Sequence, residues 1–228
     1  MMKYARTLCL LVSCLVFDAI EVAAQNSIVL RQQGTNEDEV ELKIGDEITI
    51  DIFADLGTVG ASGISVFVTL PKDVFHIIDQ RTENEAATQP FVPGLLFAEA
   101  AESRNLVVSP DDALNISDDL SLLEYVVVIG AGSDRSRTGS GVVASFQLQA
   151  IQATQSSQIS ILATPVHETR ITLPEGGERQ FRSSPQGMTI SVQLRLVNEH
   201  FRFENAGQLL DSLSVTMLRL QSSISQGP

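Results

Sequence analysis

Sulfur and large aromatic side chains are scarce in this sequence of 228 residues, which has no tryptophan, two tyrosines and two cysteines. Cys9 and Cys14 both precede Gln25, so a mature chain that begins at Gln25 contains no thiol. Such a chain forms no disulfide and offers no thiolate ligand to a metal. Its stability must therefore come from an apolar core.

The shortage of aromatic residues bears on sugar binding, because a flat side chain with an apolar face and a polar rim is what sugar rings stack on. Tyr4 lies in the leader and Tyr125 lies within an apolar run. Phenylalanine remains, and most of its positions follow patterns typical of a core, such as Phe53, Phe67 and Phe146. We expect no aromatic platform, whereas a polar groove stays open as an alternative.

Basic residues are outnumbered, since 15 lysines and arginines stand against 28 aspartates and glutamates and the net charge is −13 at pH 7. An acidic chain repels phosphates and anionic lipids. After the leader, no segment has the roughly 20 consecutive apolar residues that a membrane helix requires. We therefore expect neither a nucleic-acid partner nor a membrane span.

The first 24 residues have the three-part layout of a secretory signal peptide. Lys3 and Arg6 precede an apolar stretch from Leu8 to Phe17, and small residues follow at Val22-Ala23-Ala24. The apolar stretch is about ten residues long, about half the length needed to cross a bilayer as a helix. We expect residues 1–24 to be a signal peptide and the mature protein to be secreted, either extracellular or periplasmic.

A lipoprotein leader is the alternative, because Leu11-Val12-Ser13-Cys14 resembles the motif in which a cysteine is lipidated and becomes the mature N-terminus. The apolar run continues beyond Cys14 through Leu15, Val16 and Phe17. That continuity favours one uninterrupted hydrophobic region over a cleavage point at Cys14.

Apolar residues alternate with polar ones along most of residues 25–196, as expected of strands with one buried face. The clearest groups are Val40 to Ile44, Ile48 to Ile52, Ile64 to Leu70, Leu122 to Ile129, Val142 to Ala150 and Met188 to Leu196. Turn residues separate these groups, as at Gly45-Asp46 and Pro174 to Gly177. The pattern predicts an all-β fold, an antiparallel β-sandwich.

The pattern changes after Leu196, where apolar residues recur at every third or fourth position, as at Ala206, Leu209, Leu213 and Leu220. That spacing is typical of one helical face, although Gly207 weakens a helix. We predict one domain, residues 25–196, followed by a short C-terminal tail, residues 197–228, with helical character.

No group of residues forms a recognisable catalytic or metal-binding motif. The three histidines are far apart and none has zinc-motif spacing: His76, His167 and His200. The densest acidic cluster lacks the spacing of a calcium loop: Asp111, Asp112, Asp118 and Asp119. Gly139-Ser140-Gly141 lacks the spacing of a nucleophile elbow. We predict no enzymatic activity and no cofactor or metal.

The order of these features resembles that of a cohesin domain over about Ser27 to Leu196. The closest match is GSGVVASFQLQA at Gly139 to Ala150, similar to the family's GxLAxxxF strand after a Gly/Ser/Thr-rich loop. The first strand (Ser27 to Leu30) and the closing strand (Gly187 to Val192) are also similar to the family. So are the turn into the second strand (Leu42 to Ile50) and the turn before an apolar strand (Leu70 to Ile78). Two departures are Leu70-Pro71 in place of Tyr-Asp-Pro and the long acidic segment from Gln80 to Leu120.

The resemblance implies a jelly-roll β-sandwich of about nine strands, because that is the cohesin fold, and a protein partner, because cohesins receive dockerins in cellulose-degrading scaffolds. We therefore predict a secreted, non-catalytic module that mediates a dockerin-type or scaffold interaction linked to polysaccharide degradation. The alternatives are a polysaccharide-binding module without an aromatic platform and a structural protein of the cell envelope.

The same resemblance implies that the partner face lies on the sheet containing Ile64 to Leu70 and Leu122 to Ile129. Alternation places Ser65 and Thr69 outward, so they are the first candidates for partner contacts. Phe67 shares their side by alternation, although its pattern is also typical of a core.

A second candidate surface is the loop from Gly130 to Gly141, which contains Arg135 and Arg137. These two arginines stand out in an acidic protein, and arginine is enriched at protein interfaces. The loop predicts recognition at a rim of the sandwich instead of on a sheet.

Intact-mass analysis of the secreted form checks the leader. We expect a mass that begins at Gln25 and no reaction with thiol reagents, because both cysteines have been removed with the signal peptide. A mass that begins at Cys14 with added acyl chains would establish the lipoprotein alternative.

Overall fold

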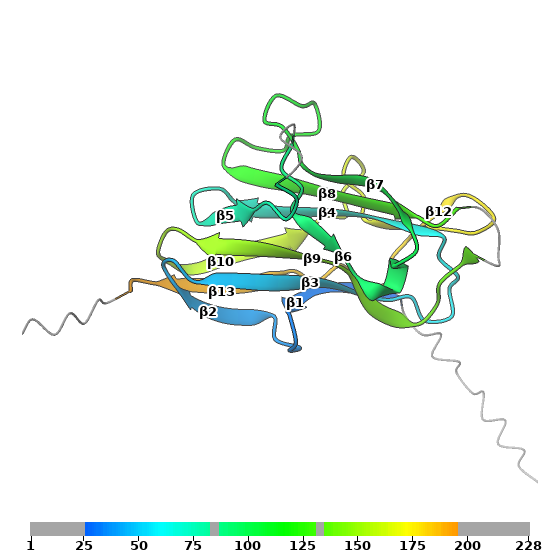
Figure 1. Cartoon of the computed structure of the whole chain (residues 1–228), viewed down its shortest axis with the longest axis horizontal. Coiled ribbons are helices and arrows are strands. Elements are labelled where there is room, and N and C mark those ends of the chain that lie inside the picture. Colours follow the sequence, from blue (N-terminus) through cyan, green and yellow to red (C-terminus); the bar gives the residue numbers. More distant parts are fainter. Residues whose placement is uncertain (1–25, 83–86, 131–134, 196–228) are drawn as a thin grey trace, which may run out of the picture. The chain divides into compact units, whose positions relative to one another are not determined.

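The computed structural model describes residues 26–82, 87–130 and 135–195, which form two packed β-sheets (Figure 1). The first sheet, here called the β3–β9 sheet, has the order β1–β3–β9–β5, and β6 also pairs with β9. Its strands are β1 (Ser27–Gln32), β3 (Glu47–Asp55), β9 (Ser140–Ala150), β5 (Phe75–Ile78) and β6 (Phe91–Pro93).

The second sheet, here called the β4–β8 sheet, is built around β4 (Gly63–Pro71). One edge of β4 pairs with β8 (Leu120–Val128), which pairs in turn with β7 (Ala101–Val107). The other edge is shared by β11 (Arg170–Thr172) and β10 (Thr154–Ile161). Beyond these two strands, β12 (Glu178–Gln180) lies next to β11, β13 (Met188–Gln193) lies next to β10, and β2 (Glu39–Lys43) lies next to β13.

Alternating apolar side chains from both sheets meet in one core. β3 buries Ile48, Ile50 and Ile52, and β4 buries Ile64, Val66, Val68 and Leu70. The predicted all-β jelly-roll sandwich is therefore confirmed. Within the described ranges, no helix has the length and apolar character needed to cross a lipid bilayer.

The first two strands, β1 and β2, belong to different sheets. β1 pairs antiparallel with β3, whereas β2 pairs parallel with β13. The turn between β1 and β2 contains Gly34, whose φ of 78° lies in the left-handed region that glycine adopts without a steric penalty. This crossover joins the edges of the two sheets.

The structure contains elements that the sequence pattern did not predict. The segment from Gln80 to Leu120, expected as a long acidic connection, contains β6, the 3₁₀ turn η1 (Leu95–Phe97) and β7. Polar residues interrupt the alternation in β7, and β6 is too short to show any. The described ranges thus hold thirteen strands, more than the nine or so expected.

The last strand is shorter than predicted. β13 ends at Gln193, so Leu194, which alternation placed inward, is 66% exposed. The predicted signal peptide and the predicted helical tail lie outside the described residues.

Truncation of Phe146 tests the core. Phe146 is buried and its ring lies 5.6 Å from that of Phe91, so Phe146→Ala should lower the free energy of unfolding by about 3–5 kcal/mol. The control is Gln147→Ala on the opposite face of β9, with an expected loss under about 1.5 kcal/mol from its hydrogen bonds to Glu47 and Gln80. Urea unfolding measures both, and equal losses would contradict the inward assignment of Phe146.

Candidate functional site

The outer surface of the β4–β8 sheet is defined by the register between its two central strands. Ser65 lies opposite Val126, Phe67 opposite Glu124, and Thr69 opposite Leu122. Directly opposed residues of antiparallel strands project from the same face. The register therefore agrees with the predicted outward direction of Ser65 and Thr69.

One half of this surface is covered by two loops. Leu122 is 1% exposed and Thr69 is 6% exposed, although neither belongs to the main core cluster. The loop of residues 162–169 contains His167, whose Nε2 donates a hydrogen bond of 2.5 Å to the carbonyl oxygen of Leu114 in the loop of residues 108–119. The His167 ring also stands edge-on to Phe67 at 5.5 Å.

The first of these loops is attached to β4 at Phe67. The Phe67 backbone N–H donates to Oγ1 of Thr169 at 3.1 Å, and its carbonyl accepts from the Leu162 N–H at 2.9 Å. These bonds occupy the part of the β4 edge that lies between its pairings with β11 and β10. We call the loops of residues 108–119 and 162–169 the cap. Thr69, named as a partner contact from the sequence, is buried beneath the cap and is not accessible.

The other half of the surface is open, and we call it the open half; it comprises Ser65, Val126, Arg104, Glu124 and Arg170. Ser65 and Val126 are half-buried in its middle. Arg104 lies 3.8 Å from the carboxylate of Glu124 on one side. On the other side Arg170 pairs with Glu178 at 2.9 Å and with Glu168 at 3.4 Å.

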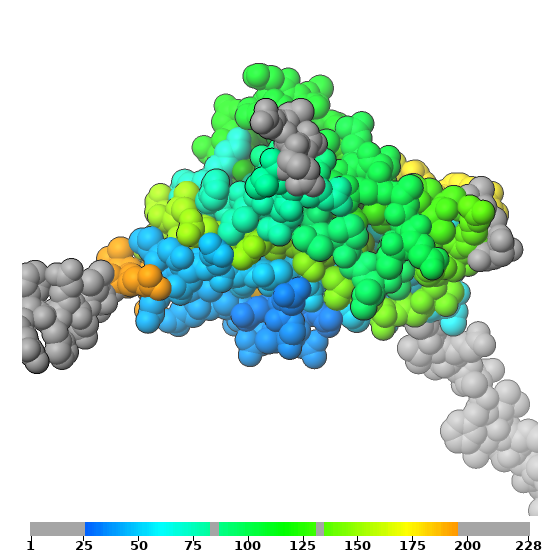
Figure 2. Space-filling view, viewed as in Figure 1, coloured from blue at the N-terminus to red at the C-terminus, as the bar shows by residue number. Residues whose placement is uncertain are grey.

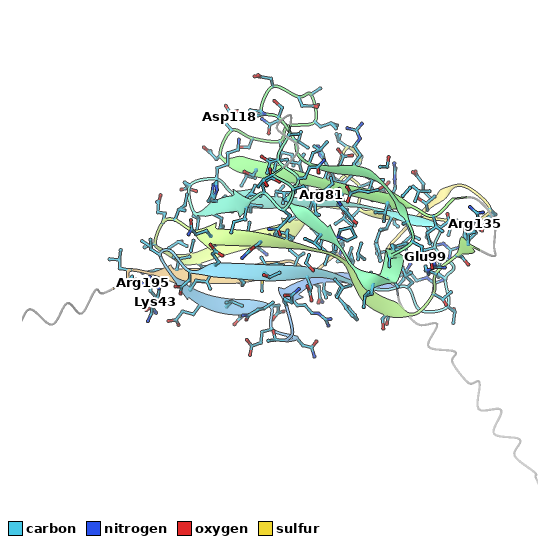
Figure 3. All side chains as sticks on the ribbon, viewed as in Figure 1. Lys43, Arg81, Glu99, Asp118, Arg135 and Arg195 are labelled. Carbon is cyan, nitrogen blue, oxygen red and sulfur yellow. The ribbon has the colours of Figure 1, made fainter. Side chains whose placement is uncertain are left out.

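The loop arginines lie away from this surface. Arg137 pairs with Glu99 at 2.6 Å, and its backbone exchanges two hydrogen bonds of 2.8 Å with Ala61, before the start of β4. Arg135 is exposed at the same end of the sandwich as Glu99 (Figure 3). The two predicted surfaces, sheet and loop rim, are thus separate regions.

A groove lies on the outer surface of the other sheet, where β6 and η1 stand beside β3 and β9. Its main cavity has a volume of about 650 Å³. Asp51, 4% exposed, lines it and accepts hydrogen bonds at Oδ1 from Ser145 at 2.8 Å and Gln33 at 3.3 Å. Figure 2 shows the green surface around residues 91–97 next to the blue surface of β1 and β3.

The groove has an apolar wall on the β6 side. Val92 and Leu95 are exposed there, and Leu95 shows 90% of its surface. The wall fits closely against β9, because a Cβ at Gly94 would collide with the carbonyl oxygen of Val142. Polar residues therefore form the floor of the groove and aliphatic residues one side.

Two phenylalanines lie on outer surfaces and not in the core. Phe53 is half-buried on β3 with the Arg31 guanidinium 3.8 Å from its ring centre, an arrangement that gives a cation–π contact. Phe67 packs under the loops described above. The core assignment of both residues from the sequence was wrong, because their strands have apolar side chains on both faces.

Tyr125 is a buried ionisable residue, and its surroundings are those of a core residue. Burial raises the pKa of the Tyr125 hydroxyl, and the nearby Glu102 carboxylate raises it further while Arg81 acts in the opposite direction. The Tyr125 ring packs against Phe91 in the core. In residues 26–82, 87–130 and 135–195, no cluster of histidine and acidic side chains is arranged to hold a metal ion.

Removal of the Thr169 hydroxyl tests the attachment of the cap. Thr169→Val leaves the Phe67 N–H without its acceptor, and we expect a loss of about 1–3 kcal/mol in the free energy of unfolding. Thr172→Val on β11 is the matched control with an expected change under about 0.5 kcal/mol, because its hydroxyl makes no hydrogen bond among the described residues. Similar losses in both variants, measured by urea unfolding, would argue against this role.

No protein-family model matches the sequence, and a comparison with curated proteins found no match. Solved structures are similar in fold. A type II cohesin domain from the cellulosome of Acetivibrio cellulolyticus superposes with a TM-score of 0.54 and 15% identity over 73% of this chain and 95% of that one. A chain in a type II cohesin–X–dockerin complex from the same organism gives a TM-score of 0.53 and 14% identity over 74% of this chain and all of that one. The described chain has a cohesin-like fold.

Proposed function

We propose that the chain is a non-catalytic binding module that holds a protein partner on the open half of the β4–β8 surface. The observation that carries the proposal is the combination of the cohesin-like fold with an uncovered sheet surface. One similar structure is a complex of a cohesin with a dockerin, which supports a protein as the partner.

The composition of the open half suits a protein interface. Half-buried Val126 provides apolar area near its centre, and ion pairs stand on both sides of it. Protein interfaces commonly have such an apolar centre with a polar rim. Because the two loops block the covered half, the partner contacts β7, β8 and β11 and not the end of β4 near Thr69.

The ion pair of Arg104 and Glu124 lies on one side of the open half. Glu124 is 7% exposed, and its Oε2 makes no hydrogen bond among the described residues while Arg104 lies 3.8 Å away. The Glu124 oxygen that lacks a hydrogen bond is buried, whereas the Arg104 side chain is 54% exposed. We propose that the partner contacts this ion pair through Arg104.

We propose from the leader that this interaction takes place outside the cytoplasm. A signal peptide over residues 1–24 exports the module of residues 25–196, with residues 197–228 as its tail. An exported scaffold that brings proteins together fits a role in polysaccharide degradation outside the cytoplasm.

Polysaccharide binding in the groove of the β3–β9 sheet is a second candidate function. It is supported by the buried Asp51, held by Gln33 and Ser145, beside the apolar wall of Val92 and Leu95. Fixed oxygen and amide groups next to an aliphatic surface suit the hydroxyls and the apolar ring face of a sugar. Phe53 adds no free platform, because Arg31 covers its ring.

Charge insertion in the open half tests the first proposal. Ser65→Arg and Val126→Arg should each reduce capture of the partner at least about tenfold, because an uncompensated cation then lies in the contact. The bait is the chain of residues 25–228, and the prey is a panel of dockerin modules together with the native secretome. Gln193→Arg, exposed at the end of β13, is the control and should capture normally.

Loop and groove variants distinguish the alternatives. If Arg135→Ala and Arg137→Ala abolish capture while Ser65→Arg and Val126→Arg do not, recognition belongs to the loop rim. If the chain is retained on insoluble polysaccharide and Asp51→Asn releases it, the groove is the functional site.

A further inference from the structure

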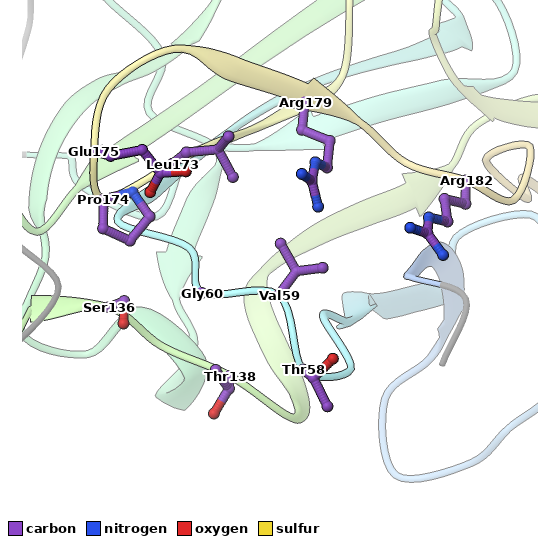
Figure 4. Close-up of a pocket in the computed structure, with 10 residues that line it drawn as sticks. All are labelled: Thr58, Val59, Gly60, Ser136, Thr138, Leu173, Pro174, Glu175, Arg179 and Arg182. Carbon is purple, nitrogen blue, oxygen red and sulfur yellow. The ribbon is translucent and has the colours of Figure 1, made fainter. Parts of the chain in front are cut away.

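A hollow of about 560 Å³ lies at the end of the sandwich, where the loop between β3 and β4, residues 136–138 before β9 and the hairpin of β11 and β12 meet (Figure 4). We call it the rim hollow. Its charged lining residues are Arg179, Arg182 and Glu175, and its other walls include Thr58, Val59 and Thr138. It is separate from the open half and from the groove, so its role does not rest on either.

Strand register directs Arg179 into the rim hollow. Arg179 lies opposite Ile171, which is fully buried in the core, so the two side chains project from the inner face of the hairpin. Its neighbour Glu178 projects outward, where it pairs with Arg170. Because β12 is the edge of its sheet, Arg179 extends over the hollow, with its guanidinium turned toward Val59 (Figure 4).

The backbone next to Arg182 is fixed in place. Phe181 is buried in the core, and the Arg182 N–H donates to Oδ1 of the fully buried Asn26 at 2.8 Å. The Arg182 side chain thus starts from a defined position on the border of the hollow. Figure 4 shows its guanidinium directed back toward that of Arg179.

Neither guanidinium in the rim hollow is neutralised by the described part of the protein. Five other arginines each pair with a carboxylate: Arg81, Arg104, Arg137, Arg170 and Arg195. Arg179 and Arg182 make no such ion pair and no side-chain hydrogen bond within residues 26–82, 87–130 and 135–195, and Glu175 pairs with neither. Two unpaired arginines that line one hollow, in a chain of net charge −13, offer charged donors that an anion can bind.

The rest of the lining narrows the chemistry of the anion. The hydroxyls of Thr58 and Thr138 make no hydrogen bond among the described residues, and they are free to bond a hydroxylated ligand. Val59, Leu173 and Pro174 provide an aliphatic surface. A volume of about 560 Å³ lies within the range of small-ligand sites.

We propose that the rim hollow binds the carboxylate of a sugar acid, a uronic acid unit, between Arg179 and Arg182. The guanidinium groups receive the carboxylate, the threonine hydroxyls contact the sugar hydroxyls, and Val59 and Pro174 pack against the ring. A neutral sugar lacks the group that the two arginines recognise, so charge sets the specificity.

Titration of the chain of residues 25–228 with galacturonate oligomers tests this site, with calorimetry for affinity and amide NMR shifts for location. We expect saturable binding that weakens with added NaCl, and no binding of galactose oligomers of equal length. Arg179→Gln and Arg182→Gln should each lower the affinity at least about tenfold, the effect of a lost charge-assisted hydrogen bond.

Arg135→Gln is the matched control, because this exposed arginine lies at the same end of the sandwich but does not line the hollow. It should retain the affinity of the parent chain. The proposal is overturned if galacturonate does not bind, or if Arg135→Gln weakens binding as much as Arg179→Gln does, which would indicate a diffuse field. Preference for a sulfated galactose over galacturonate would overturn the carboxylate assignment.

Discussion

The pairing of β4 with β8, from Gly63 opposite Val128 to Pro71 opposite Leu120, is the constraint on which the surfaces of this protein depend. It decides which side chains enter the core and which face outward, because opposed residues share a face. The other edge of β4 has two partial partners, β11 and β10, with an interval at Phe67. The loop that bonds to Phe67 in that interval covers half of the outer surface and leaves the other half open.

The hairpin of β11 and β12 separates two kinds of recognition. On its outer face, Arg170 is neutralised by Glu168 and Glu178 and contributes to the open half. On its inner face, Arg179 is unpaired among the described residues and contributes to the rim hollow. The alternation of side chains along the two strands of this hairpin thus places an ion-paired interface on one face and the proposed anion site on the other, so a partner protein and a sugar acid use different side chains.

The sequence predicted the fold well where alternation is long and uninterrupted, as in β3 and β4. In β9 the predicted alternation holds from Ala144 onward, because a register shift buries Val143 and leaves Val142 in the groove. The sequence missed β6 and β7, because three residues are too few to show a period and because the polar residues of AESRNLV hide one. For the candidate site, the outward direction of Ser65 and Thr69 followed from alternation. The burial of Thr69 did not follow from alternation, because it results from loops that pack over the sheet, one of them attached through Thr169, about a hundred positions further along the chain than Phe67.

By itself, the sequence determined the fold class, the inward faces of the long strands, the net negative charge and the shortage of aromatic residues for sugar stacking. These are local or compositional properties that short-range periodicity and residue counts express. Only the tertiary structure decided that Arg137 pairs with Glu99, that Phe53 lies beneath Arg31, and that Arg179 and Arg182 share a hollow. The physical reason is that strand register and loop packing join residues distant in sequence, and charge pairing depends on distances that a linear pattern does not contain.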